Sequence, residues 1–165
     1  MSNQTKNVVL LGLGVALAMV LAYVELLLPP LFPAVPGIKM GLPNIMIVFL
    51  LYRRGPLFAA SVSLVRILLV SLLFGNAMAL FYSLAGGVLS LLAMILLQRC
   101  RLFSTVGVSV AGGVLHNVGQ VLMAMLLLET AQLGYYLVVL TVTGTVSGTL
   151  IGLCGAALVK RLKNV

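Results

Sequence analysis

Acidic side chains are almost absent from this sequence. The chain of 165 residues contains no aspartate, and its only glutamates are Glu25 and Glu129. Paired aspartates that hold Mg²⁺ on a diphosphate are therefore missing, and two scattered glutamates do not replace them. The chain also lacks a Walker A loop and any evident Ser–His–acid or Cys–His arrangement. These absences predict that the chain alone is not an enzyme and does not couple ATP hydrolysis.

Metal-binding and disulfide-forming side chains are equally scarce. His116 is the only histidine, Cys100 lies between two arginines, and Cys154 lies in an apolar run. Two cysteines in such different settings do not indicate a disulfide framework. One histidine and two distant glutamates do not make a metal-ligand set. The sequence therefore predicts no metal and no cofactor.

Charge of either sign is rare, whereas apolar residues dominate the chain. Hydrophobic residues make up 62% of the sequence and charged residues 7%, and the mean hydropathy is +1.27. A soluble domain of this size could not bury so much apolar surface, so the composition predicts a single membrane domain over residues 1–165. The net charge of +8 comes largely from pairs of basic residues between apolar segments. This spacing indicates membrane orientation and not nucleic-acid binding.

Six apolar segments predict an all-α, multi-pass protein with six transmembrane helices in the cell membrane. The expected spans are 8–28, 38–52, 57–74, 77–97, 106–128 and 133–159. The second would cover about 22 Å, less than the roughly 30 Å of hydrocarbon. We expect either that neighbouring helices shield it or that part of the preceding loop enters the membrane.

The basic residues predict how the helices are oriented. In a six-span arrangement Lys39 and Glu129 fall on one side. The basic residues on the other side are Lys6, Arg53, Arg54, Arg99, Arg101, Lys160, Arg161 and Lys163. By the positive-inside rule, both termini are cytoplasmic. Residues 29–37 then form an outer loop, which is long enough to cover the outer face as a lid.

Arg66 is the most informative polar residue within a span. An arginine at this depth costs about 2.5 kcal/mol or more, so it requires a partner or water. A purely structural interpretation is an ion pair with Glu25 that joins the first and third helices. Alternatively, a guanidinium not fully neutralised by Glu25 would bind an anionic group of a substrate. The sequence leaves both interpretations open.

Other polar residues lie at a similar depth. Arg66 and Gln120 are each about 12 Å below the outer ends of their helices, and Asn44 and Tyr82 also lie in the outer half. The inner halves contain mainly Leu, Val, Ala and Gly, which predicts a cavity open to the outside. Tyr135 and Tyr136 are explained better as interfacial belt residues.

The fifth span carries the motif HNVGQ. His116 and Gln120 lie on one helical face, and Asn117 lies about 100° around the helix. These side chains could fix helix packing or could form a hydrogen-bonding wall of the cavity. The predicted substrate-binding residues are therefore Lys39, Asn44, Arg66, Tyr82, His116, Asn117 and Gln120.

Small residues recur every four positions in the first helix. One series is Gly14, Ala18 and Ala22, and another is Gly12 and Ala16. Such faces let helix backbones approach closely. They predict either packing within the bundle or a docking face for another membrane subunit.

Four ordered motifs resemble the Gx transporter family across nearly the whole chain. They read PGIKMGLPNI, RILLVSLLFGN, FYSLAGGVLSLLAM and GVSVAGGVLHNVGQ. Members of this family are often labelled heptaprenyl diphosphate synthase component I. The family is similar to the S-components of energy-coupling-factor transporters, which bind substrates with six transmembrane helices.

The resemblance implies roles for two regions. In S-components the first outer loop caps the substrate, and this loop corresponds to residues 29–37 together with the Gly37–Asn44 motif. S-components also dock their transmembrane partner through small residues of the first helix, here Gly12, Ala16 and their neighbours. Pro43 stands where the family pattern has alanine, and a proline is tolerated at the start of a helix.

Three functions follow as hypotheses. The first is an S-component-like subunit that binds a small anionic or amphipathic molecule for uptake, with an energy-coupling transmembrane subunit and ATPases as partners. The second is a membrane accessory subunit of a heptaprenyl diphosphate synthase. The third is a solitary, gradient-driven transporter in which Glu25 or His116 carries protons.

Overall fold

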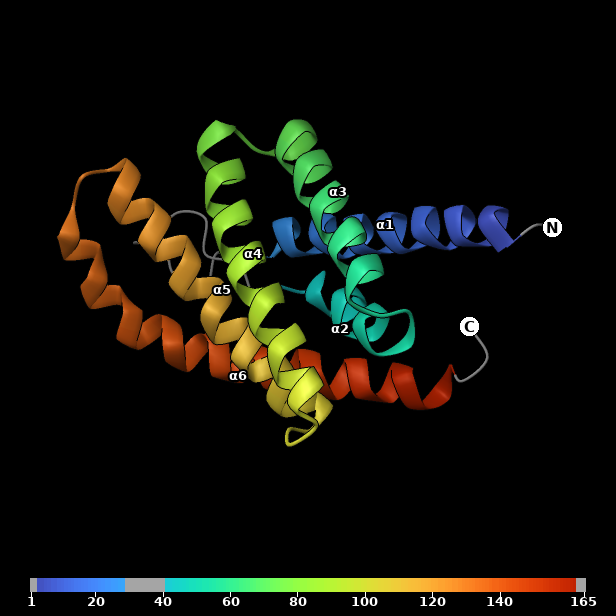
Figure 1. Ribbon diagram of the computed structural model, residues 1–165. Coiled ribbons are helices and arrows are strands. Elements are labelled where there is room, and N and C mark those ends of the chain that lie inside the picture. The colour runs from blue at the N-terminus through green and yellow to red at the C-terminus, as the bar shows by residue number, and fades with distance from the viewer. Residues whose placement is uncertain (1–2, 29–40, 163–165) are drawn as a thin grey trace.

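Helices account for all the regular secondary structure in residues 3–28 and 41–162, which are the residues that the computed structural model describes (Figure 1). The α-helices are α1 (Asn3–Leu27), α2 (Asn44–Arg53), α3 (Pro56–Phe74), α4 (Ala77–Cys100), α5 (Thr105–Leu127) and α6 (Tyr136–Arg161). A 3₁₀ helix, η1 (Ala131–Tyr135), precedes α6. The all-helical prediction is therefore confirmed for this part of the chain. The expected outer loop at 29–37 and Lys39 lie outside the described residues.

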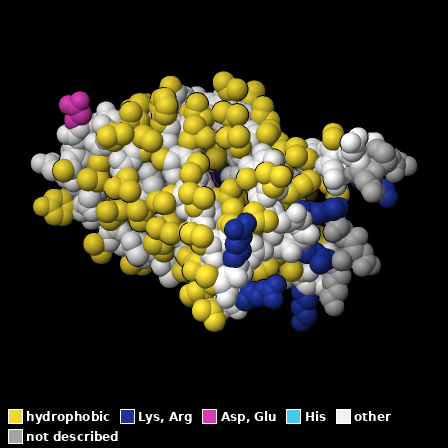
Figure 2. Space-filling view, in the orientation of Figure 1, with side chains coloured by type: hydrophobic (Ala, Val, Ile, Leu, Met, Phe, Trp, Pro, Cys, Tyr) yellow, Lys and Arg dark blue, Asp and Glu magenta, His cyan; other side chains and the backbone are white. Residues whose placement is uncertain are grey.

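Five of the helical segments are long and apolar enough to cross a membrane. They are Gln4–Leu27, Pro56–Phe74, Ala77–Cys100, Thr105–Leu127 and Ala131–Arg161. Their outward-facing side chains are apolar, and Leu72 and Val138 are 77% and 73% exposed. Figure 2 shows apolar side chains covering most of the visible face. Lipid is the solvent that suits such a surface, so the chain is a multi-pass membrane protein.

The second helix is shorter than the sequence predicts. α2 begins directly after Pro43 and has 10 residues, so it is about 15 Å long. Six consecutive residues from Met46 to Leu51 are buried, and α2 packs against α1, α3 and α6. Shielding by neighbouring helices thus allows a helix of this length in the bundle centre.

Local sequence signals explain where the other helices begin. Gly55 adopts φ 94° and is followed by Pro56 at the start of α3, a position where proline needs no N–H. The side chains of Asn76 and Ser104 accept hydrogen bonds from Ala79 N and Gly107 N, at 2.8 and 3.1 Å. They cap α4 and α5 in the usual way. Asn76 is thus a capping residue at the connection between α3 and α4.

Glycines bring α4, α5 and α6 unusually close together. A Cβ atom built on Gly148 would lie 2.7 Å from Val110 Cα, and one on Gly152 would lie 2.8 Å from Val106 Cα. Neither position tolerates a side chain without movement of the facing backbone. The glycine repeat of α6 is therefore a packing face against α5, as small residues are in membrane bundles.

Charged side chains mark the two ends of the bundle. Figure 2 shows Lys and Arg side chains gathered toward the lower right and an acidic side chain at the opposite end. Most basic residues lie near the chain termini or at the α2–α3 and α4–α5 connections, whereas Glu129 is exposed in the α5–η1 connection. We call these the basic end and the Glu129 end.

Candidate functional site

A small polar cavity lies between α1, α2, α3, α4 and α5, and we call it the polar cavity. Its volume is about 20 Å³, enough for about one water molecule. Its lining is unusually polar for the interior of this bundle and consists of Ala22, Glu25, Gly41, Asn44, Arg66, Ile67, Val70, Ser71, Ser83, His116 and Gln120. Asn44 begins α2 and Glu25 lies near the end of α1, so the cavity is in the half toward the Glu129 end.

Arg66 supplies positive charge to this cavity. The residue as a whole is half-buried, but its Nε atom is buried and has no hydrogen-bond partner among the described residues. Glu25 attracts the guanidinium electrostatically. A buried donor without a partner is costly, so Arg66 retains hydrogen-bonding capacity for a group entering the cavity.

Glu25 is held from two sides. Its Oε1 accepts a hydrogen bond of 2.5 Å from the backbone N–H of Gly41, a residue with φ 83°. The same carboxylate attracts Arg66. Glu25 therefore links α1, α3 and the segment that leads into α2, in addition to lining the polar cavity.

The HNVGQ motif is divided by the helical turn of α5. His116 and Gln120 line the polar cavity, whereas the Nδ2 atom of Asn117 donates a hydrogen bond of 2.8 Å to Leu140 O in α6. All three residues are buried. Two residues of the motif thus belong to the polar cavity, and the third joins α5 to α6.

Close packing of α4 on α5 positions His116 and Gln120. A Cβ atom built on Gly86 would lie 2.7 Å from His116 O and 2.8 Å from Gln120 Cγ, and one on Gly119 would lie 2.7 Å from Ala85 O. These glycines let α4 bring Ser83 to the same cavity. The cavity's shape therefore depends on two residues that carry no side chain.

The predicted substrate-binding residues are only partly brought together. Asn44, Arg66, His116 and Gln120 line the polar cavity, and so does Glu25. Tyr82 is half-buried and does not line the cavity formed by the described residues. Ser71 and Ser83 do line it. Ser83 is expected in the same half of the bundle but not in the substrate-binding set, and Ser71 is not predicted. Its signal in the sequence is a hydroxyl within an apolar span, between Arg66 and the end of α3.

The small-residue face of α1 also divides into two. Gly14, Ala18 and Ala22 are buried, and a Cβ atom on Gly14 would lie 3.2 Å from Leu50 Cδ1 and 3.4 Å from Val62 Cγ2. By contrast, Gly12 and Ala16 are exposed, and nothing lies within 4 Å of a Cβ atom on Gly12. The first series packs within the bundle, while the second is accessible on the helix surface.

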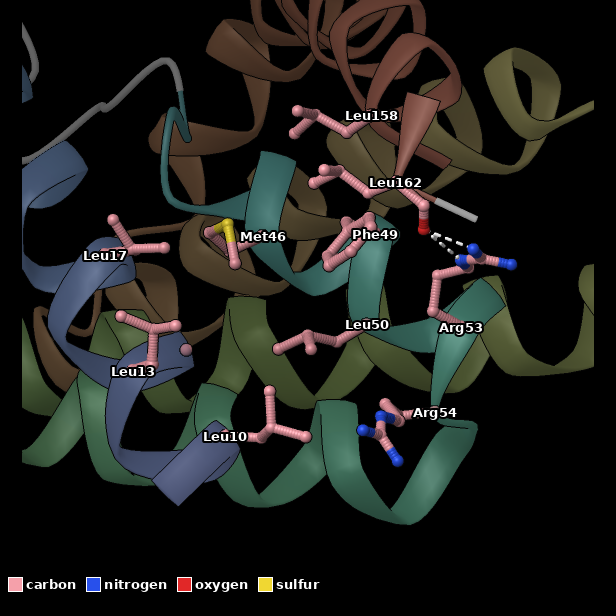
Figure 3. A pocket seen from close by; sticks show the side chains of 11 residues that line it. Leu10, Leu13, Leu17, Met46, Phe49, Leu50, Arg53, Arg54, Leu158 and Leu162 are labelled. Atoms are coloured by element: carbon pink, nitrogen blue, oxygen red, sulfur yellow. Dashed lines mark hydrogen bonds between the residues drawn. The ribbon is translucent and has the colours of Figure 1, made fainter. Parts of the chain in front are cut away.

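A larger and almost entirely apolar pocket lies toward the basic end, and we call it the apolar pocket. Its volume is about 220 Å³. Figure 3 shows leucines of α1, the Met46, Phe49 and Leu50 side chains of α2, and Leu158 and Leu162 around it. Arg53 and Arg54 lie at its edge (Figure 3). The sequence predicts one cavity, which opens to the outside. A pocket in the opposite half of the bundle is therefore an addition to that prediction.

Neither cavity resembles a metal centre. Among residues 3–28 and 41–162, no three His, Cys, Asp or Glu side chains come together. The polar cavity offers one cation, one carboxylate, amides, hydroxyls and an imidazole. This combination can bind and orient a small polar or anionic group.

The long apolar helices and the polar residues between them define a multi-pass membrane protein with an internal polar site. The chain belongs to the family described as Heptaprenyl diphosphate synthase component I, whose model matches residues 15–158. The resemblance found in the four motifs is thereby confirmed. No curated protein and no solved structure matches the chain.

Proposed function

We propose that this protein is the substrate-binding membrane subunit of an uptake system, similar to the S-components of energy-coupling-factor transporters. The observation that carries the proposal is the buried Nε atom of Arg66 at the polar cavity, which has no hydrogen-bond partner in residues 3–28 and 41–162. Ionisable residues inside a membrane protein commonly mark the path or the site of a substrate. Arg66 would bind an anionic group of the transported molecule.

The other lining residues would orient the substrate. Asn44 and Gln120 offer amide donors and acceptors, Ser83 offers a hydroxyl, and His116 offers an imidazole. They come from α2, α4 and α5 and converge on the cavity that Arg66 lines. Convergent polar groups in an otherwise apolar protein are typical of small-molecule sites.

The polar cavity must widen to accept a substrate. Its volume of about 20 Å³ is far below the roughly 300–1,000 Å³ of small-molecule sites. The proposal therefore requires a second conformation in which the helices around Arg66 separate. By the positive-inside rule the basic end is cytoplasmic, so the cavity would open to the outside.

Energy would come from a separate ATPase module, because the sequence contains no Walker A loop. The exposed Gly12 and Ala16 of α1 offer a surface on which the backbone of a partner helix could approach closely. Gly14, Ala18 and Ala22, which are buried, would instead maintain the bundle.

Native mass spectrometry of the protein purified from its own membranes tests the proposal. We expect a bound small molecule in the wild type. In Arg66→Gln its occupancy should fall by a factor of about ten or more, because the loss of about 1.4 kcal/mol of binding energy lowers the affinity tenfold. Arg99→Gln is the matched control, because Arg99 is exposed at the basic end. Equal occupancy in Arg66→Gln and in the control, with both variants folded, would refute the assigned site.

A second candidate function is supported by the family description, which names a component of heptaprenyl diphosphate synthase. In that case the chain would be a membrane accessory subunit that assists a soluble synthase. Affinity purification from native membranes separates the two functions. Recovery of a prenyl synthase without an ATPase module would favour the accessory subunit, and the reverse would favour uptake.

A further inference from the structure

The lining of the apolar pocket near the basic end changes from apolar side chains in the interior to two arginines at one edge. The function proposed for the polar cavity gives this pocket no role. Its interior is formed by leucines of α1 together with Met46, Phe49 and Leu50 of α2, and the two arginines lie at one edge (Figure 3). From Leu10 to Leu17 the pocket follows α1 for about 10 Å. It therefore offers an apolar slot that ends beside two cations.

These cations have no acidic partner nearby. The sequence contains only two acidic residues. Glu25 lines the polar cavity and Glu129 is exposed in the α5–η1 connection, so no aspartate or glutamate side chain balances the charge at the pocket. Arg54 is exposed, and its only hydrogen bond with the described residues is made by its backbone N–H, to Leu50 O. The guanidinium of Arg54 is therefore available to an anionic group of another molecule.

Arg53 is positioned by the end of α6. Its Nε atom donates a hydrogen bond of 3.0 Å to Leu162 O, and its Nη2 atom donates to the same oxygen. This contact holds the guanidinium at the pocket edge and leaves Nη1 available. An oriented guanidinium beside a second, unpaired one is well suited to the several oxygens of a phosphate.

The pocket is also accessible from the lipid. Leu13 and Leu17 line it and are 54% and 43% exposed. A helix is about 10–12 Å across and would not enter a pocket of about 220 Å³, whereas a single hydrocarbon or isoprenoid chain would. Part of such a chain would occupy the pocket while the remainder stays in the bilayer.

We propose that the apolar pocket binds one chain of a phosphate-headed amphiphile from the adjacent leaflet, with Arg53 and Arg54 contacting its phosphate. This site is separate from the polar cavity, so it does not depend on the proposed uptake function. We assign the pocket to an anionic membrane phospholipid, because that is the phosphate-headed amphiphile that surrounds the exposed leucines of the pocket in a bilayer. Binding of a prenyl phosphate in its place is one outcome of the test.

Native mass spectrometry of the delipidated, detergent-solubilised full chain tests this site. Phosphatidylglycerol, phosphatidylcholine with the same acyl chains, and farnesyl phosphate are titrated separately and in competition. We expect one phosphatidylglycerol to bind about tenfold more tightly than phosphatidylcholine, a difference of about 1.4 kcal/mol. Displacement of phosphatidylglycerol by an equal concentration of farnesyl phosphate would overturn the phospholipid assignment in favour of a prenyl phosphate.

Two pairs of variants locate the binding. Arg54→Gln removes the unpaired cation, and Arg99→Gln is its control at an exposed arginine outside the pocket. Leu13→Trp narrows the slot, and Leu64→Trp is its control at an exposed leucine of α3. We expect Arg54→Gln to lose the preference for phosphatidylglycerol over phosphatidylcholine, and Leu13→Trp to bind both lipids more weakly. Neither control should change the preference or the affinity. If Arg54→Gln does not fold, Leu13→Trp still tests the pocket.

Three results would overturn the proposal. The first is equal binding of phosphatidylglycerol and phosphatidylcholine. The second is an equal effect of the pocket variants and their controls. The third is photo-crosslinking from position 17 in native membranes that captures a polypeptide and no lipid, which would assign the pocket to a protein partner.

Discussion

A Cβ atom built on Gly86 of α4 would lie 2.7 Å from the backbone oxygen of His116 in α5. The two helices therefore touch at the level of the polar cavity, which His116 and Gln120 line. Because the obstructing atom belongs to the backbone, it cannot move aside as a flexible side chain would. Helix packing and cavity geometry are thus determined by the same contact.

Replacing Gly86 by alanine should destabilise the protein. We expect Gly86→Ala to lower the free energy of unfolding by about 1–3 kcal/mol, the usual range for overpacking. Thermal unfolding in detergent, followed by far-UV circular dichroism, measures the effect. Gly12→Ala is the control, since nothing lies within 4 Å of its Cβ. Equal melting temperatures for the two variants would contradict the close approach.

Asn117 should act in stability and not in ligand binding. Its amide donates to Leu140 O at 2.8 Å, and loss of this buried bond leaves a carbonyl unsatisfied, at a cost of about 1–3 kcal/mol. We expect Asn117→Ala to melt at a lower temperature but to retain its co-purified ligand per folded molecule. Gln120→Ala, at the polar cavity, should instead lose the co-purified ligand while its melting temperature changes less. Ligand loss in Asn117→Ala comparable with that in Gln120→Ala would place Asn117 in the site.

Glu25 and Arg66 should be energetically coupled. Replacement of either residue alone leaves the other charge less compensated, whereas replacement of both removes the imbalance. We expect a double-mutant cycle of Glu25→Gln and Arg66→Gln to give a coupling of about 0.5–3 kcal/mol in the free energy of unfolding. Glu129→Gln combined with Arg66→Gln is the control cycle and should be additive, because Glu129 is exposed in the α5–η1 connection. Additivity in both cycles would show that Glu25 does not compensate Arg66.

Labelling of single cysteines should establish which end is cytoplasmic. Cys100 is exposed at the end of α4 near Arg99 and Arg101. In cells, a membrane-impermeant maleimide should not reach Cys100, but it should label Glu129→Cys in a background with Cys100→Ser and Cys154→Ser. Inside-out vesicles should give the opposite pattern. Labelling of Cys100 from outside would reverse the orientation and move the polar cavity to the cytoplasmic half.

The two faces of α1 should respond differently to large side chains. Gly12→Leu and Ala16→Leu change exposed positions and should leave the free energy of unfolding within about 0.5 kcal/mol of wild type, as surface substitutions usually do. They should nevertheless reduce recovery of the partner membrane subunit in a pull-down. Ala18→Leu, at a residue with 0% exposure, should destabilise the bundle itself. Unchanged recovery of the partner with both exposed-face variants would remove that face from the proposed interface.

Much of the architecture follows from the order of residues along the chain. Long apolar runs must form helices in lipid because the hydrocarbon offers no partner for backbone N–H and C=O groups. Arg66 and Gln120 lie within long hydrophobic spans, and their polar side chains likewise require burial against protein or water. Even the capping by Asn76 and Ser104 is local, since each side chain bonds a backbone N–H three residues later.

The tertiary structure decided which of several equivalent local patterns has which role. The series Gly14–Ala18–Ala22 and Gly12–Ala16 have the same spacing, but only the first faces other helices. Asn117 and His116 are adjacent in sequence, yet one contacts α6 and the other lines the polar cavity. The apolar pocket joins α1 and α2 to the end of α6, which is distant from them along the chain. Sequence periodicity specifies the faces of each helix, but the choice of neighbour arises from packing between helices.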